Sequence, residues 1–144
     1  MTASDSTTAF HEIKTNIAGR DDGDIMAYVN GREGGVEAIL DLVFSQLPGA
    51  FLPDKAKRQE ISFQYEINTD DGPRYYYADV RDGTCTTGSG RMDSPRVTMI
   101  MDIPIFLQVL TGTMAPVRAF LTRKIKVVGD MMAATKFESW FARP

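Results

Sequence analysis

The chain has 144 residues, of which 43% are apolar and 24% are charged, ordinary values for a single globular domain. One cysteine, Cys85, excludes an internal disulfide and any zinc or iron–sulfur site built from several cysteines, and one histidine, His11, excludes a histidine cluster. Sixteen basic and nineteen acidic side chains leave a net charge of −3, so no overall field attracts nucleic acid, and we expect no nucleic-acid partner.

We expect no targeting signal at either end of the sequence. The first residues, Met1 to Ser6, are polar and lack the apolar core of a secretory signal, and no apolar run is long enough to span a bilayer. The last three residues, Ala142 to Pro144, differ from the peroxisomal Ser-Lys-Leu signal. With no disulfide to form, we expect a cytoplasmic protein.

Residues 1–33 show the weakest pattern. Phe10, Ile13 and Ile17 recur at helical spacing and predict a short helix, and the Gly- and Asp-rich stretch from Gly19 to Asp24 then predicts a loop. We therefore expect an N-terminal extension over 1–33 and the main domain over 34–144.

A clear amphipathic helix follows the extension. Apolar residues at i, i+3, i+4, i+7 and i+11 form one stripe, and Pro48-Gly49 is expected to end the helix. The stripe consists of Val36, Ile39, Leu40, Val43 and Leu47.

The middle of the chain changes to a two-residue period. Residues 61–67 alternate apolar and polar side chains, and further strands are predicted over 75–80, 84–87 and 96–102. Short turns rich in Gly, Asp and Pro separate them, so consecutive strands are expected to pair as an antiparallel meander.

Helical patterns return after Asp102. One helix is expected to carry Phe106 and Leu110, a second begins at Pro116, a fifth strand covers 124–128, and a helix from Met131 to Phe141 closes the chain. This order predicts one α+β domain with a five-stranded, antiparallel-rich mixed sheet that is covered on one face by helices.

No motif typical of an enzyme is present. Cys85 and His11 lie far apart in the sequence, no Gly-x-Ser-x-Gly segment exists, and Gly88-Ser89-Gly90 lacks the lysine and the helix of a phosphate loop. We therefore predict that the chain is not an enzyme and has no metal, cofactor or catalytic residue. An inward-facing acid with a raised pKa, for instance Asp79 or Glu66, would instead favour carboxylate chemistry.

Methionine is concentrated in the last half of the chain. A methionine- and phenylalanine-lined cavity adapts to flexible apolar guests, but the same residues also make ordinary cores, and composition leaves both interpretations open. Six of the eight methionines lie between 92 and 132: Met92, Met99, Met101, Met114, Met131 and Met132.

The order of these elements resembles the sterol carrier protein 2 (sterol-transfer) family over about residues 34 to 141. The most distinctive part is the basic strand Lys124-Ile125-Lys126-Val127-Val128-Gly129-Asp130, which follows the segment Ala119-Phe120-Leu121 and precedes an apolar C-terminal helix. Family members usually carry glycine directly before the first lysine of that strand, where this chain has Arg123.

The resemblance implies a non-catalytic lipid carrier with an apolar tunnel between sheet and helices, which takes a fatty acid, acyl-CoA, sterol or phospholipid. The C-terminal helix is expected to act as a lid. The residues predicted to bind the lipid are Phe63, Tyr65, Met99, Met101, Phe106, Leu107, Leu110, Phe120, Phe137, Trp140 and Phe141. The cations predicted to contact a head group or a membrane surface are Arg123, Lys124 and Lys126.

A second hypothesis stays open at this point. The domain would be an accessory module that presents a hydrophobic substrate to a partner enzyme or docks on that enzyme, and it would then form a stable complex through an exposed apolar patch. For either hypothesis the sequence allows a monomer or a homodimer, with transient contact to a membrane surface.

Overall fold

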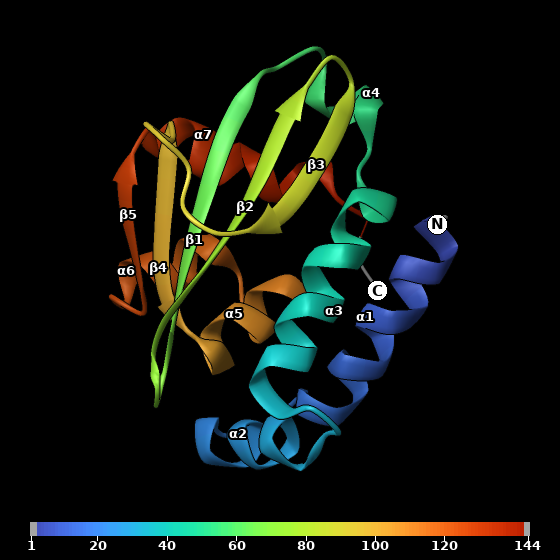
Figure 1. The fold of residues 1–144 in the computed structure, drawn as a ribbon, viewed down its shortest axis with the longest axis vertical. Coiled ribbons are helices and arrows are strands. Elements are labelled where there is room, and N and C mark those ends of the chain that lie inside the picture. The colour runs from blue at the N-terminus through green and yellow to red at the C-terminus, as the bar shows by residue number, and fades with distance from the viewer. Residues whose placement is uncertain (1–2, 143–144) are drawn as a thin grey trace.

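The computed structural model describes residues 3–142, apart from the side chains of residues 3–6 and 138. In this part of the chain a five-stranded mixed sheet is covered on one face by helices, as the α+β prediction requires (Figure 1). The elements are α1 (Ala3–Ile17), α2 (Asp22–Gly31), α3 (Gly35–Ala50), α4 (Pro53–Ala56), β1 (Ile61–Thr69), β2 (Gly72–Arg81), β3 (Thr84–Ser89), β4 (Val97–Asp102), α5 (Ile103–Leu110), α6 (Pro116–Leu121), β5 (Ile125–Gly129), α7 (Met131–Phe137) and the 3-10 turn η1 (Glu138–Trp140). Among the described residues, no helix is both long and apolar enough to cross a bilayer.

Residues 3–31 form two helices where a short helix and a loop were expected. Asp21 is the N-cap of α2, because its Oδ1 accepts the backbone N–H of Asp24 at 2.8 Å. Asp21, Asp22 and Asp24, which suggested a loop, therefore lie at the start of a helix, where negative charge is favourable. Phe10, Ile13 and Ile17 of α1 are almost fully buried in the same core as α3 and the sheet.

Helix α3 carries the predicted apolar stripe but ends two residues after Pro48, at Ala50. Proline has no backbone N–H, so the carbonyl of Phe44 four residues earlier lacks its helical donor. The hydroxyl of Thr87 on β3 donates to that carbonyl instead. Pro48 is thus accommodated in the last turn of α3, and the hydrogen bond from Thr87 to the Phe44 carbonyl joins α3 to the sheet.

The strand order is β3-β2-β1-β4-β5, which corrects the predicted meander at one connection. β4 does not pair with β3; it lies parallel to β1 on the other side, with Tyr65 opposite Met99. The loop after β3 crosses β2 and β1 to reach this position (Figure 1). Gln64 fixes that crossing, since its side-chain amide donates to the carbonyls of Tyr76 and Gly90 and accepts the N–H of Met92.

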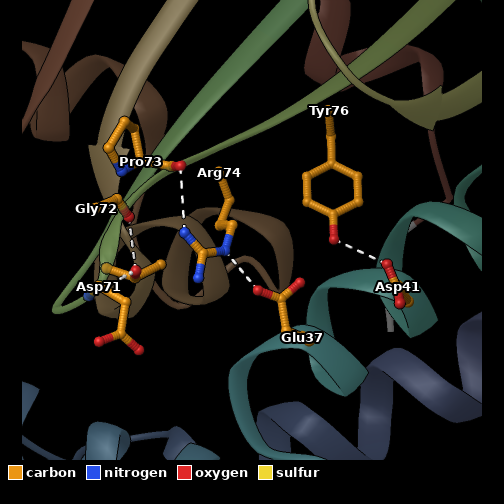
Figure 2. A network of polar contacts seen from close by, with 8 residues as sticks. Glu37, Asp41, Asp71, Gly72, Pro73, Arg74 and Tyr76 are labelled. Carbon is orange, nitrogen blue, oxygen red and sulfur yellow. Dashed lines mark hydrogen bonds and ion pairs between the residues drawn. The ribbon is translucent and has the colours of Figure 1, made fainter.

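Two polar contacts join α3 to β2 (Figure 2). The guanidinium of Arg74 pairs with Glu37, and the hydroxyl of Tyr76 donates to the carboxylate of Asp41 at 2.8 Å. Residues four apart on a helix and two apart on a strand have nearly the same spacing, so both pairs form at once. Helix α3 is therefore joined to β2 at two points about one helical turn apart.

The C-terminal helix is shorter than the predicted span from Met131 to Phe141. Helix α7 ends at Phe137, a 3-10 turn follows, and Phe141 forms an isolated antiparallel bridge with Phe51. Two backbone hydrogen bonds anchor this end: the N–H of Leu52 donates to the Trp140 carbonyl at 2.6 Å, and the N–H of Ala142 donates to the Ala50 carbonyl at 2.7 Å. Pairing with the end of α3 replaces the last helical turn.

Candidate functional site

An apolar cavity of about 60 Å³, here called the inner cavity, lies between the sheet and the helices. β1 and β4 are parallel neighbours in register, so Tyr65 and Met99 stand side by side in its wall. Alternate residues of a strand point to the same face, and Phe63 and Met101 therefore face the cavity as well. α5, α7 and the residues after η1 complete the wall with apolar side chains.

Eight of the eleven side chains predicted to bind the lipid line the inner cavity: Phe63, Tyr65, Met99, Met101, Phe106, Leu110, Phe137 and Phe141. Leu107 does not line it, because adjacent helical positions point about 100° apart and this side chain is buried elsewhere in the core. Trp140 is buried against Phe137, with ring centroids 5.8 Å apart. Phe120 is 39% exposed and lines a neighbouring cavity.

Six further residues of the inner cavity were not predicted from the sequence. Phe10 reaches it from α1 and Leu47 from the end of α3, although both belong to apolar stripes that the sequence does reveal. A stripe shows that a helix face is buried, but it does not show which cavity that face borders. The remaining four are Val109, Pro116, Ala134 and Ala142.

A second apolar cavity of about 160 Å³, here called the outer cavity, lies beside the first, between α6, α7 and β5. Met99, Pro116 and Ala134 line both cavities and therefore form the partition between them. Val117, Phe120 and Met131, each at least 39% exposed, lie on the other side of the outer cavity. The two cavities thus lead from the core toward the surface at α6.

Tyr65 carries the one polar group among the side chains of the inner cavity. Burial raises the pKa of its hydroxyl, and the neighbouring Cys85 adds to the effect, so the hydroxyl stays protonated and neutral. Among the residues that the structure describes, the hydroxyl has no hydrogen-bond partner, whereas the Tyr76 hydroxyl is bonded to Asp41. The ring of Tyr65 packs edge-on against Phe44 and Phe106.

The start of α7 is fixed by Asp130. Its carboxylate accepts the backbone N–H of Ala133 at 3.0 Å and pairs with the guanidinium of Arg96 at 2.9 Å. These two contacts, the N–H first, lower the pKa of Asp130. The segment that covers the cavities is therefore anchored at its first turn by Asp130 and at its end by the two backbone hydrogen bonds to residues 50 and 52.

The predicted cations, Arg123, Lys124 and Lys126, are exposed and lie outside the inner cavity. Arg123 and Lys126 border an open groove with Leu121 at the end of α6. Arg123 has a φ of 62°, and the N–H groups of Arg123 and Lys124 donate to the carbonyls of Phe120 and Ala119. This is a Schellman ending, in which the left-handed position favours glycine.

The carboxylates considered for an enzyme do not face the cavities. Asp79 pairs with Arg81 at 2.9 Å, and neither Asp79 nor Glu66 lines the inner or the outer cavity. In the part of the chain that is described, no three His, Cys, Asp or Glu side chains are grouped to hold a metal ion. The walls can therefore enclose an apolar molecule but present no carboxylate, imidazole or amine to it.

Solved structures place the fold in the class of sterol carrier protein 2 structures. Sterol Carrier Protein 2 Like 2 from Aedes aegypti superposes with a TM-score of 0.59 at 25% identity, over 72% of this chain and 94% of that one. Its palmitated form in solution gives 0.58 at the same identity. The sec-alkylsulfatase Pisa1 from Pseudomonas sp. shares the fold with a TM-score of 0.64 at 19% identity, over 73% of this chain but 16% of the sulfatase.

The sequence comparisons give the same class and define the family. Hydroxysteroid dehydrogenase-like protein 2 from Bos taurus is 29% identical over 108 residues, which are 74% of this chain and 25% of that relative. The chain therefore spans about a quarter of the relative's length. The model of the SCP-2 sterol transfer family matches residues 44–142. The chain therefore belongs to the SCP-2 sterol transfer family.

Proposed function

We propose that the chain binds and transfers a lipid (a fatty acid, acyl-CoA, sterol or phospholipid) without changing it chemically. The observation that carries the proposal is the pair of adjoining apolar cavities, whose walls hold methionine and aromatic side chains and no charged group. Such walls accept an apolar chain of varying shape, and they offer no acid or base to attack it.

The dimensions of the cavities require the wall to move when a ligand enters. Volumes of about 60 and 160 Å³ are smaller than the roughly 300–1,000 Å³ of typical ligand pockets. Met99 is unbranched and flexible and stands in the partition, so its displacement would join the two cavities into one channel. The proposed tunnel is thus a state that the ligand stabilises.

Hydrophobic burial is large enough to drive that change. Burying the methylenes of a palmitoyl chain contributes roughly 12 kcal/mol gross, at ~0.8 kcal/mol each. Ordering of the ligand and repacking of the wall offset a large part of this gain. The segment from α7 to Ala142 is the proposed lid, since Phe137 and Phe141 line the inner cavity and two backbone hydrogen bonds hold its end.

An acyl chain is the ligand class that we place first. The Aedes aegypti relative, with 25% identity, is a palmitated protein in solution, and this chain carries the same fold. We further propose that the Tyr65 hydroxyl, which lines the inner cavity without a partner in the described residues, hydrogen-bonds the polar end of the ligand.

A second candidate function is that of a module attached to, or docking on, an enzyme. The match covers 25% of the dehydrogenase-like relative and 16% of the alkylsulfatase, both of which are much longer than the matched region. In this version the same cavities would present a hydrophobic substrate to the partner. We retain the cytoplasm as the proposed compartment and a monomer or homodimer as the proposed assembly.

Native mass spectrometry of freshly purified protein, followed by titration with a fluorescent fatty acid, tests the carrier function. We expect a co-purifying lipid mass and saturable binding of one probe per chain at micromolar concentration. Absence of both would overturn the proposal. A pull-down that recovers a stable enzyme complex, together with negligible transfer of probe between vesicles, would favour the module over the carrier.

A further inference from the structure

The exposed apolar side chains gather in one region, which we call the α6–β5 rim and define as residues 117–132. Among the described residues, every large apolar side chain that is exposed lies within it: Val117, Phe120, Leu121, Val128, Met131 and Met132. Leu121 is 73% exposed and Met132 is 66% exposed. Figure 1 shows α6 and β5 at the side of the molecule away from α1 and α3. A concentration of this kind is typical of an interaction surface.

The charge of the rim is opposite to that of the whole protein. Residues 117–132 contain one acid, Asp130, which pairs with Arg96, and four cations, although the chain has a net charge of −3. These cations are exposed, and no ion pair in the described part of the chain involves them. They are Arg118, Arg123, Lys124 and Lys126. The rim thus combines apolar side chains with positive charges that have no acidic partner.

The rim is continuous with the ligand cavities. Val117, Phe120 and Met131 line the outer cavity, and Phe120 and Leu121 also border the groove that contains Arg123 and Lys126. The outer cavity shares Met99 with the inner one. An apolar molecule that leaves the core past Met99 therefore emerges among the exposed apolar side chains of the rim.

We propose that the α6–β5 rim docks on the surface of an anionic lipid bilayer, with the apolar side chains inserted at the interface and the four cations at the phosphate level. This inference rests on the proposed lipid-binding function and adds where the ligand enters and leaves. Apolar side chains beside lysine and arginine are the combination that binds at a membrane surface.

Arg123 is a rim cation that borders the groove at the end of α6, beside Leu121. It occupies a left-handed position, φ 62°, but Lys57 and Arg58 in the basic cluster at α4 do so as well, with φ 49° and 63°. The backbone conformation therefore does not distinguish the two clusters, and the assignment rests on the apolar side chains and the adjoining cavities.

Sedimentation of the full chain with vesicles tests the rim. The vesicles contain phosphatidylcholine alone or phosphatidylcholine with phosphatidylserine. The variant R123E/K124E/K126E reverses three rim cations, and K55E/K57E/R58E makes the same charge change in the exposed basic cluster at α4. At ~1 kcal/mol per cation, we expect the rim variant to lose about a hundredfold in partitioning to the anionic vesicles. The α4 variant should stay within about twofold of the wild type.

A second variant, L121S/M132S, tests the apolar contribution and should lower partitioning about tenfold. Wild-type partitioning should also be weak on phosphatidylcholine alone and should fall with salt. Circular dichroism spectra confirm that each variant is folded. Equal losses for the rim and α4 variants, or equal binding to both vesicle types, would overturn the proposal. So would a homodimer that only the rim variant dissociates, which would make a second copy the occupant.

The same preparation separates this proposal from the proposed function. Titration of the wild-type protein with a fluorescent fatty acid in the absence of vesicles measures the cavities alone. Probe binding without selective docking on anionic vesicles overturns the rim proposal and leaves lipid binding in place. Selective docking without probe binding overturns the proposed function and leaves the rim as a membrane contact.

Discussion

Phe63 on β1 and Phe137 on α7 stack in the wall of the inner cavity, with ring centroids 4.1 Å apart and ring planes inclined by 19°. Phe137 also contacts the rings of Trp140 and Phe141. One side chain therefore joins the sheet to the segment that covers the cavities. If the C-terminal segment acts as the proposed lid, this contact would hold it closed, and a bound ligand would pack against the two rings.

Phe137→Ala should lower the free energy of unfolding by about 3–5 kcal/mol, because it removes a buried ring and three ring contacts. Urea unfolding measures the change. Phe120→Ala, at a side chain that is 39% exposed, is the control and should cost clearly less. If Phe137→Ala does not fold, Phe137→Leu keeps part of the volume and should still be less stable than the control. Equal costs would show that the stack does not secure the C-terminal segment.

Ala134→Leu should discriminate between long and short acyl chains. The added side chain fills the partition that the inner and outer cavities share. We expect affinity for a palmitoyl-length probe to fall about tenfold and affinity for an octanoyl-length probe to change little, since a loss of two buried methylenes is worth about that factor. The matched control is Ala27→Leu on the exposed face of α2. Equal effects on both probes would contradict a joined channel.

Tyr65→Phe should weaken binding of a ligand with a polar end. Loss of one neutral hydrogen bond is worth about 1 kcal/mol, so affinity for a fatty acid should fall roughly fivefold while affinity for an alkane of equal length is retained. Competition against a fluorescent probe measures both. Tyr76→Phe is the control, because Asp41 already accepts its hydroxyl; it should reduce stability without changing this selectivity.

Arg123→Gly should raise the thermal midpoint by a few degrees, because glycine relieves the left-handed backbone at the end of α6, a gain of about 0.5–1 kcal/mol. Lys124→Gly removes the same charge next to it at a residue whose φ is not positive, and it should lower the midpoint. Calorimetry compares the two variants. A decrease for both would mean that Arg123 is not strained.

Cys85 should react slowly with thiol reagents in the folded protein. Burial, with a smaller contribution from Asp79, raises the pKa of its thiol from 9.0 to about 12. Only the thiolate reacts, so at a pH below 9 the rate should be about a thousandfold lower than in urea. Because burial raises the pKa of the folded thiol above its unfolded value, the buried neutral thiol contributes fully to the free energy of unfolding below pH 9. This contribution is lost as the pH rises toward 12. Rapid alkylation of the native protein at pH 8 would contradict this burial.

Residues whose environment is set by local periodicity were predictable. Four of the five residues of the α3 stripe, Ile39, Leu40, Val43 and Leu47, are buried as expected, and Val36 is partly buried. The alternation over 61–67 placed Phe63 and Tyr65 on the cavity face. The partner of β4 was not predictable, because the crossover depends on Gln64 holding a loop 26 residues away in the sequence. The contributions of Phe10 and Leu47 to the cavity were missed for the same reason. The periodicity of one helix predicts which of its faces is buried, but it does not predict which other element that face contacts.

One cysteine and one histidine exclude an internal disulfide, a metal site built from several cysteines and a histidine cluster. Together with the periodicity, the sequence by itself determined the α+β class and the strands and later helices that line the site, but not the contributions of α1 and α3. Only the tertiary structure decided that Met99 and Ala134 separate two cavities and that, among the described residues, six exposed apolar side chains share one rim with four cations outside any ion pair. The physical reason is that hydrophobic burial is non-directional: it selects which side chains leave water, while packing and strand order decide which of them meet.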